Sequence, residues 1–303
     1  MRRLIDAHAH VVEHLHGFAR GGELRAVGHG RARWADGSEF LIFPETLGEK
    51  DVTFQRLHDF LTAKGVEKAV LLQGSFYGFQ NEYTLEAARA YPEMFVPAFT
   101  FDPFAGNWEK IFDRFFVREG VHLVKFEVSS DGGIMSYHEP FRLDGTRFLP
   151  IAEAIAQGGG TLVLDIGTQP NASFQPDAVA NLAVRFPKMH IIVCHLTAPR
   201  LGEEEGLRRA LTAMKACNIW FDLSAIPWKT KPETYPYPTA RRYVAMAKDI
   251  VGASKLLWGS DLPSPLTRDI YEHLYEYLDN GELFTLEELE GVYWRNAMAA
   301  YML

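Results

Sequence analysis

The sequence predicts a single (β/α)8 barrel, on three observations. Short apolar segments alternate with segments of helical spacing along the chain, and eight such units can be counted. The apolar segments are continuous runs, as is typical of parallel strands buried on both faces. A doubly wound open sheet is the alternative, but it would place a glycine-rich phosphate turn where this chain has His8-Ala9-His10. No linker or composition shift marks a second domain, so the predicted domain covers residues 1–303.

The first strand is expected around Leu4 and Ile5, and residues 11–50 follow it without helical spacing. We interpret 11–50 as an insertion. Asp36-Gly37 separates two runs of strand-like composition, which predicts a hairpin inside it. Long segments of this kind are often lids over a site. Arg31 and Arg33 share one face of the hairpin, and we hypothesise that they offer a cation to an anionic substrate. The alternative is a surface hairpin with solvated arginines.

From residue 52 onward, helices and strands alternate. The seven further strands are expected at 68–73, 95–101, 121–128, 161–166, 190–195, 219–223 and 255–258. The helices are expected at 53–64, 81–91, 107–118, 147–157, 177–186, 203–216, 239–251 and 268–278. Glycine or proline follows most of these segments, as helix ends require. A last helix should begin at Thr285, which forms a capping box with Glu288.

Charge and cysteine content indicate which kinds of partner and which cellular compartment the protein suits. The formal net charge is −8, and no run of lysine and arginine is present, so we expect a small-molecule substrate rather than nucleic acid. Two cysteines form no disulfide framework and suit a reducing cytoplasm. We expect no signal peptide, and no apolar run approaches the roughly 18 residues of a membrane span. Barrels of this size often pair, so a homo-oligomer is one expectation.

Two histidines in the first strand point to a metal site. His8 and His10 are two residues apart, and on a strand such side chains share a face. Two imidazoles aimed at one point are what a metal ion requires, although a surface pair would show the same spacing. Asp261 ends the last predicted strand and would complete the ligand set.

Polar residues end nearly every predicted strand, where a barrel carries its catalytic groups. They are Gln73, Asp102, Lys125, Glu127, Asp165, His195, Asp222 and Asp261. Each has an alternative: Lys125 and Glu127 can form an ion pair inside the barrel, and Asp165 can cap the next loop. We expect Asp222 to point to the helix layer and Cys194 to act as a small apolar residue. Trp228 either flanks a substrate ring or anchors a surface loop.

These residues predict a metal-assisted reaction. A divalent ion would lower the pKa of a bound water towards about 7 and polarise a carbonyl oxygen. Asp261 could then take the proton from water and pass it to the leaving group. His195 could hydrogen-bond the carbonyl oxygen or the water. Lys125 and Glu127 could orient substrate or complete the metal shell.

The sequence resembles the amidohydrolase superfamily, in its amidohydrolase-2 branch. The motifs are 5–10 (Ile-Asp-Ala-His-Ala-His), 193–196 (Val-Cys-His-Leu), 257–263 (Leu-Trp-Gly-Ser-Asp-Leu-Pro) and 295–297 (Arg-Asn-Ala). Residues 72–78 with Asn81 are similar to the second-strand region of sugar-lactone and pyrone-lactone hydrolases. The resemblance implies a barrel with one metal ion, held by His8 and His10. It further implies that Asp261 is both ligand and base and that His195 contacts substrate or water.

One departure concerns the fifth strand, where many members carry a metal-binding histidine and this chain has Asp165. Asp165 could still be a ligand, which would shift preference from zinc towards manganese. Glu127 could supply the missing ligand instead. Some lactonases of the group are thought to work without metal, which is a third option.

Together these arguments predict a hydrolase of a small, carboxylated lactone or related ester or amide, using one zinc or manganese ion. The alternative is a non-oxidative decarboxylase of an aromatic or related carboxylic acid on the same site. A third hypothesis, from another class of function, is a catalytically inactive barrel that serves as a binding module. The residues assigned to substrate binding are Lys125, Gln73, Tyr77, Arg31, Arg33 and Trp228.

Overall fold

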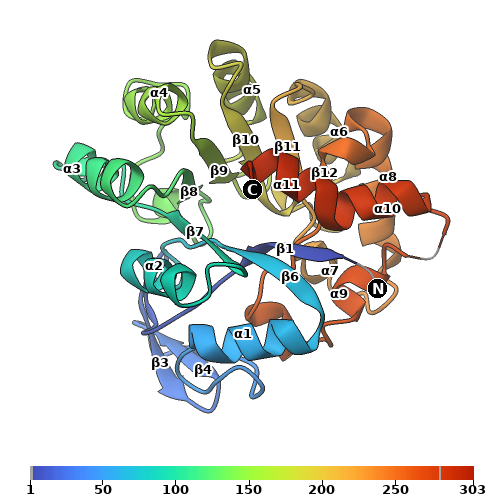
Figure 1. Ribbon diagram of the computed structural model, residues 1–303, viewed down its shortest axis with the longest axis horizontal. Helices are drawn as coiled ribbons and strands as arrows, with labels where there is room; N and C mark the ends of the chain where they lie inside the picture. Colours follow the sequence, from blue (N-terminus) through green and yellow to red (C-terminus); the bar gives the residue numbers. More distant parts are fainter. Residues whose placement is uncertain (1–2, 280) are drawn as a thin grey trace.

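A computed structural model describes residues 3–279 and 281–303, and it confirms a barrel of eight parallel strands surrounded by helices (Figure 1). Residues 1, 2 and 280 of the predicted domain lie outside the described residues. The barrel strands, in order around the sheet, are β1 Leu4–Ala9, β6 Val66–Leu71, β7 Phe95–Phe99, β8 Leu123–Glu127, β9 Thr161–Asp165, β10 His190–Val193, β11 Ile219–Asp222 and β12 Leu256–Leu257. Spatial order equals chain order, as repeated right-handed βα units require.

Backbone hydrogen bonds close the barrel between its last and first strands. Ala7 N donates to Trp258 O at 3.1 Å, and Asp261 N donates to His8 O at 2.8 Å. The carboxylate of Asp6 strengthens this seam, because it accepts from Ser260 N at 2.8 Å and from the Ser260 hydroxyl at 2.5 Å. The same contacts hold the two predicted metal-binding segments side by side.

The helices are α1 Phe54–Ala63, α2 Asn81–Ala90, α3 Trp108–Phe112, α4 Leu149–Gln157, α5 Pro176–Arg185, α6 Glu204–Ala213, α7 Ile226–Lys229, α8 Pro238–Val251, α9 His273–Glu276, α10 Leu286–Glu290 and α11 Asn296–Tyr301. The capping box at Thr285 is present. The helix predicted at 268–278 is wrong, since only α9 forms there. Asp269 accepts from Ile270 N at 2.8 Å and from the ring of His273 at 2.6 Å, which competes with helical bonding.

A second sheet follows β1 and lies on the side of α1 (Figure 1). It is antiparallel and consists of β2 His16–Ala19, β3 Gly22–Gly28, β4 Arg31–Trp34 and β5 Glu39–Leu41. The hairpin predicted at Asp36-Gly37 is confirmed, as β4 pairs with β5. Phe18 N donates to Ser75 O at 2.9 Å, so this sheet is fixed to the loop after β6.

The barrel interior is packed with apolar side chains, and α11 closes one end. Ala297, Ala300 and Tyr301 of this helix belong to the same buried cluster as the inward residues of the strands. Cys194 lies in that cluster, as the sequence predicted, and Trp220 lies there too. With one end closed, a substrate can enter only from the carboxyl ends of the strands. Within the described residues, no helix is long and apolar enough to cross a membrane.

Candidate functional site

A cavity of about 300 Å³ lies at the carboxyl ends of the barrel strands. Most of the predicted site residues line it: His8, His10, Tyr77, Lys125, Glu127, Asp165, His195, Trp228 and Asp261. They come from β1, from β8, β9 and the loops around the barrel, so the fold gathers residues that are far apart in the chain. Phe40 and Leu41 of β5 add an apolar wall from the second sheet.

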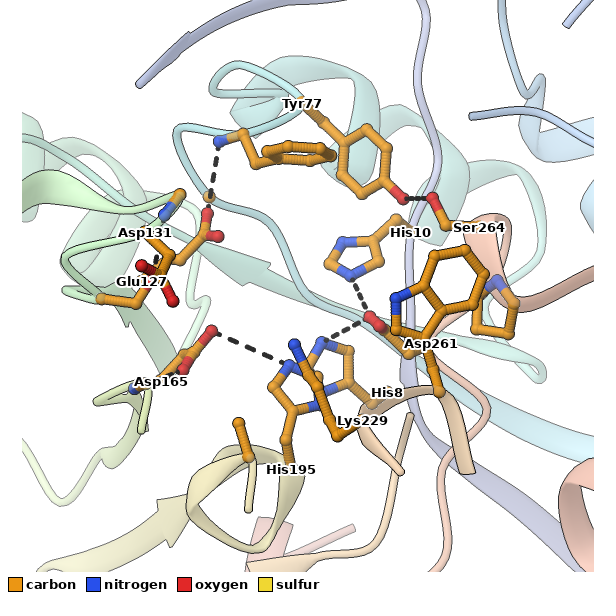
Figure 2. Close-up of a pocket in the computed structure, with 18 of the residues that line it drawn as sticks. His8, His10, Tyr77, Glu127, Asp131, Asp165, His195, Lys229, Asp261 and Ser264 are labelled. Atoms are coloured by element: carbon orange, nitrogen blue, oxygen red, sulfur yellow. Dashed lines mark hydrogen bonds and ion pairs between the residues drawn. The ribbon is translucent and has the colours of Figure 1, made fainter. Parts of the chain in front are cut away.

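His8, His10 and Asp261 meet at one point in this cavity (Figure 2). Asp261 Oδ1 lies 3.1 Å from His10 Nε2 and 3.5 Å from His8 Nε2. Gly259 makes the approach of the strands possible, because a Cβ there would lie 2.9 Å from the Cβ of His8. Asp261 itself has a left-handed backbone (φ 61°), a strained conformation that turns its carboxylate to the histidines.

Hydrogen bonding fixes which nitrogen of each histidine carries the hydrogen. His8 Nδ1 lies 3.0 Å from Asp222 Oδ2, and His10 Nδ1 lies 2.8 Å from Leu72 O. A carboxylate and a carbonyl oxygen only accept, so each Nδ1 must donate. Burial lowers the pKa of His8 to about 4 and also lowers that of His10, so both rings are neutral. Both Nε2 atoms therefore carry a lone pair and no hydrogen.

With the hydrogen of each ring on Nδ1, the two Nε2 atoms are acceptors, and they converge on the Asp261 carboxylate, which is also an acceptor. Burial raises the pKa of Asp261, but His195, His10 and His8 together lower it by more, so the carboxylate is ionised. His8 Nε2 is buried and has no hydrogen-bond partner among the described residues. An unpaired buried acceptor is costly, and a divalent ion would satisfy all three atoms at once. The residues present therefore fit a metal ion.

Asp222 supports this group, which corrects the expectation that it points to the helix layer. It follows Trp220 by two residues on β11, and Trp220 faces the barrel interior, so Asp222 must do the same. Its Oδ2 accepts from His8, while Oδ1 accepts from His195 N at 2.9 Å and Ser224 N at 3.0 Å. This carboxylate orients two histidines of the site at once.

His195 stands on a turn of left-handed residues directly after β10, with a φ of 57°. Its Nδ1 lies 3.1 Å from Ser224 O and 2.9 Å from Ser224 Oγ. Because the carbonyl only accepts, Nδ1 carries the hydrogen in the neutral ring and Nε2 is bare. Nε2 faces the cavity, 3.8 Å from Asp165 Oδ2. Neutral His195 can accept from water, but it cannot donate to a carbonyl oxygen.

Lys125, Glu127 and Asp165 form the polar wall beside the candidate metal ligands. Glu127 and Asp165 are direct partners across β8 and β9. Gly74 lets Glu127 reach this place, since a Cβ there would lie 2.1 Å from Glu127 Oε2. Burial raises the pKa of Glu127 to about 7, Lys125 opposes that shift, and Asp165 adds to it. Burial lowers the pKa of Lys125, but Cys194 and these acids raise it more, so Lys125 stays charged.

Asp165 and Glu127 do not join the group of candidate metal ligands found among the described residues. Replacement of the fifth-strand histidine by one of them is one of the options that the sequence leaves open, and it stays a hypothesis. Asp165 Oδ1 instead accepts from Gly167 N at 2.8 Å, which is the capping alternative. No direct Lys125–Glu127 ion pair is found within the described ranges, so that alternative is not realised.

Gln73, Arg31 and Arg33 lie outside the residues that line the cavity, against their assignment to substrate binding. Gln73 is buried, and its amide nitrogen donates to Thr84 Oγ1 and Ala98 O, so its role is to hold the second barrel unit together. Both arginines pair with Glu39 on the exposed face of the hairpin. The cavity receives the next residues of β5, Phe40 and Leu41, instead.

Arg31→Ala and Arg33→Ala are therefore expected to leave the KM of the enzyme within about twofold of the original value. Each arginine is about half exposed and paired with Glu39, and exposed pairs of this kind contribute at most about 1 kcal/mol to stability. Steady-state kinetics on both variants is the test. A KM raised tenfold or more in either variant would restore the lid hypothesis.

Sequence reasoning missed several site residues. Lys229 on α7, Ser264 and Arg200 line the cavity. Ser224, by contrast, is expected among the polar residues at the end of the seventh strand, and it lies beneath the cavity. Tyr77 OH and Ser264 Oγ are 2.5 Å apart, which ties the loop after β6 to the segment after β12 (Figure 2). The sequence signal that could have found Lys229 is its position, since it follows β11 on the catalytic side of the barrel.

Comparison with known proteins identifies the family and agrees with the barrel fold. A family model described as amidohydrolase matches residues 5–303. Among curated proteins, no sequence matches the chain.

Among solved structures, an amidohydrolase from Burkholderia multivorans with bound zinc has a TM-score of 0.74 at 15% identity, and 99% of each chain is covered. A protein from Acinetobacter baumannii described as a probable 2-pyrone-4,6-dicarboxylic acid hydrolase, with citric acid bound, has a TM-score of 0.69 at 17% identity over 99% of each chain. A 2,6-dihydroxybenzoate decarboxylase from Rhizobium has a TM-score of 0.58 at 14% identity, over 81% of this chain and 87% of that one.

Proposed function

Since this chain belongs to the amidohydrolase family, we propose that it is a zinc-dependent hydrolase that opens a small carboxylated lactone, or cleaves a related ester or amide. The observation that carries the proposal is the convergence of His8 Nε2, His10 Nε2 and Asp261 Oδ1, all without hydrogen, in an open cavity. Two imidazoles and one carboxylate favour zinc over manganese. The zinc in the Burkholderia protein and the citric acid in the Acinetobacter protein support the metal and the carboxylated substrate.

The chain's own residues have separable tasks in this reaction. Zinc bound by His8, His10 and Asp261 would supply a Lewis acid that polarises a carbonyl group and makes water more acidic. His195 Nε2 accepts a hydrogen from the attacking water and so orients it. Lys125, charged and only 2% exposed, stabilises the oxyanion that develops on the substrate.

Proton transfer falls to the carboxylates. Within the described residues, both histidines contact the Asp261 carboxylate through Oδ1. Oδ2 is therefore the oxygen that can take the proton of the attacking water. Asp261 then passes this proton to the leaving oxygen, which completes ring opening with one acid group formed. Tyr77 and Trp228 border the cavity and limit the position of the ring.

Decarboxylation is the second candidate. The Rhizobium neighbour supports it, since that protein of similar fold is a decarboxylase. In this reading the reacting carboxylate would occupy the metal-binding end of the cavity, and Glu127 would deliver the proton that replaces carbon dioxide. Burial raises the pKa of Glu127 to about 7, which suits a proton donor.

The two reactions separate by product. Zinc-loaded protein would be mixed with 2-pyrone-4,6-dicarboxylate, with neutral sugar lactones, and with 2,6-dihydroxybenzoate. Proton release in a pH-stat, lost in Asp261→Asn, is the expected result with a lactone. Carbon dioxide release without net acid would favour the decarboxylase. Neither product from any substrate, with zinc bound and the fold intact, would favour a binding module.

A further inference from the structure

Three basic residues gather around one tryptophan near α7, at the wall of the cavity. Trp228 and Lys229 both line the cavity, and Figure 2 shows the Lys229 side chain extending into it. Lys231 Nζ lies 3.6 Å from the centre of the Trp228 ring, and Arg268 Cζ lies 4.1 Å from it. Two cations on one indole hold the ring in place by cation–π attraction. We call Trp228, Lys229, Lys231 and Arg268 the α7 cation group.

The positive charges of this group have no ion-pair partner among the residues that the structure describes. No carboxylate of the described residues forms an ion pair with Lys229, Lys231 or Arg268 within 4.0 Å. Arg200, another cation that lines the cavity, does have a partner in Asp131. Burial lowers the pKa of Lys231 to about 7, and the charges of Arg268 and Lys229 lower it further. Lys229 and Arg268 are thus two cations without a carboxylate partner, and their charges disfavour a third charge on Lys231, in a chain whose net charge is −8.

The charges at the floor of the cavity are arranged differently. Asp261 is ionised and would share a divalent ion with His8 and His10, while Lys125 faces Glu127 and Asp165. Floor charges are therefore matched without the substrate, whereas the α7 cation group requires an anion from outside. A carboxylate or another oxyanion fits it, since Lys229 donates hydrogen bonds and Lys231 and Arg268 add attraction at longer range.

We propose that the α7 cation group is an anion subsite, which binds a carboxylate or similar oxyanion of the substrate other than the group that reacts. This inference rests on the proposed function for the identity of the reacting group, but the binding it predicts does not. The substrate would then carry its scissile carbonyl at His8, His10 and Asp261 and its anionic substituent at Lys229. The site selects an acyl compound with a separate negative charge over a neutral lactone of equal size.

Binding of a matched pair of probes tests this without turnover. Benzenesulfonate and methyl phenyl sulfone are similar in size and differ in charge, and a sulfonate is a weak ligand for zinc. Titration calorimetry on the zinc-loaded protein should show benzenesulfonate binding about tenfold more tightly, the size of one charge-assisted contact. Lys229→Met should remove this preference, and Lys229→Arg should keep most of it. Added salt should weaken the sulfonate alone.

Two controls locate the effect. Lys215→Met makes the same change of charge at an exposed position after α6, outside the cavity lining, and should keep the preference. His8→Ala should bind benzenesulfonate as the original protein does, even without zinc. The proposal is overturned if Lys229→Met keeps the preference, if Lys215→Met loses it equally, or if His8→Ala abolishes sulfonate binding, since the anion would then sit on the metal. A failure to hydrolyse any lactone would not affect these outcomes.

Discussion

His8→Ala is expected to remove the single equivalent of zinc that the purified protein should hold, and to lower the hydrolytic rate about 10³-fold. His8 is the histidine whose Nε2 is buried without a partner among the described residues, so the ion is what satisfies it. Two ligands remain in the variant, and a two-ligand site does not retain zinc through purification. Loss of several kcal/mol of transition-state stabilisation corresponds to a factor of this size.

Elemental analysis of the dialysed protein is the measurement, with His14→Ala as the matched control. His14 is also an N-terminal histidine, but it is exposed and lies outside the cavity lining. The control should keep one equivalent of zinc, and both variants should show the circular dichroism of the original protein. Full zinc content in His8→Ala would refute the assigned site and direct attention to the other residues of the cavity.

The barrel was predictable because its determinants are local. Each strand is a continuous apolar run, and each helix has its own spacing and stop signals, so alternation is visible without tertiary information. The helix predicted at 268–278 does not form for another local reason. The side chain of Asp269 accepts hydrogen bonds from Ile270 N and the His273 ring, and these compete with the backbone bonds of a helix. The spacing of apolar residues carries no information about such side-chain hydrogen bonds.

Site residues could be predicted from the sequence only where a barrel strand fixes their position. His8 and His10 share a strand face, and Asp261 ends the neighbouring segment, so their meeting follows from the barrel itself. Arg31 and Arg33 were assigned to the cavity from a hairpin whose facing residue, Glu39, was not considered. Lys229 follows β11 in a segment whose path depends on left-handed residues such as Ala225, and no periodicity predicts that path.

Asp222→Asn is expected to weaken zinc binding about 100-fold, although Asp222 does not touch the ion. Both oxygens of this buried carboxylate accept: Oδ2 from His8 Nδ1, and Oδ1 from His195 N and Ser224 N. An asparagine has one oxygen and one NH2 group, so one of these sides must face a donor. If NH2 faces His8, the ring has to move its hydrogen to Nε2, the atom that should bind zinc. If NH2 faces His195 and Ser224, two buried N–H groups lose their acceptor.

Asp165→Asn is the matched control, because Asp165 also ends a barrel strand and lines the same cavity. Zinc dissociation constants, measured by competition with a chelator, should rise in Asp222→Asn and stay within about twofold in Asp165→Asn. Nitrogen chemical shifts of the histidines should show the hydrogen on Nδ1 of His8 in the original protein and a changed state in Asp222→Asn. Equal loss of zinc in both variants would make Asp165 a ligand after all. Unchanged affinity in Asp222→Asn would mean that the orientation of His8 is set by β1 alone, with the carboxylate beneath it serving only to satisfy the turn at His195.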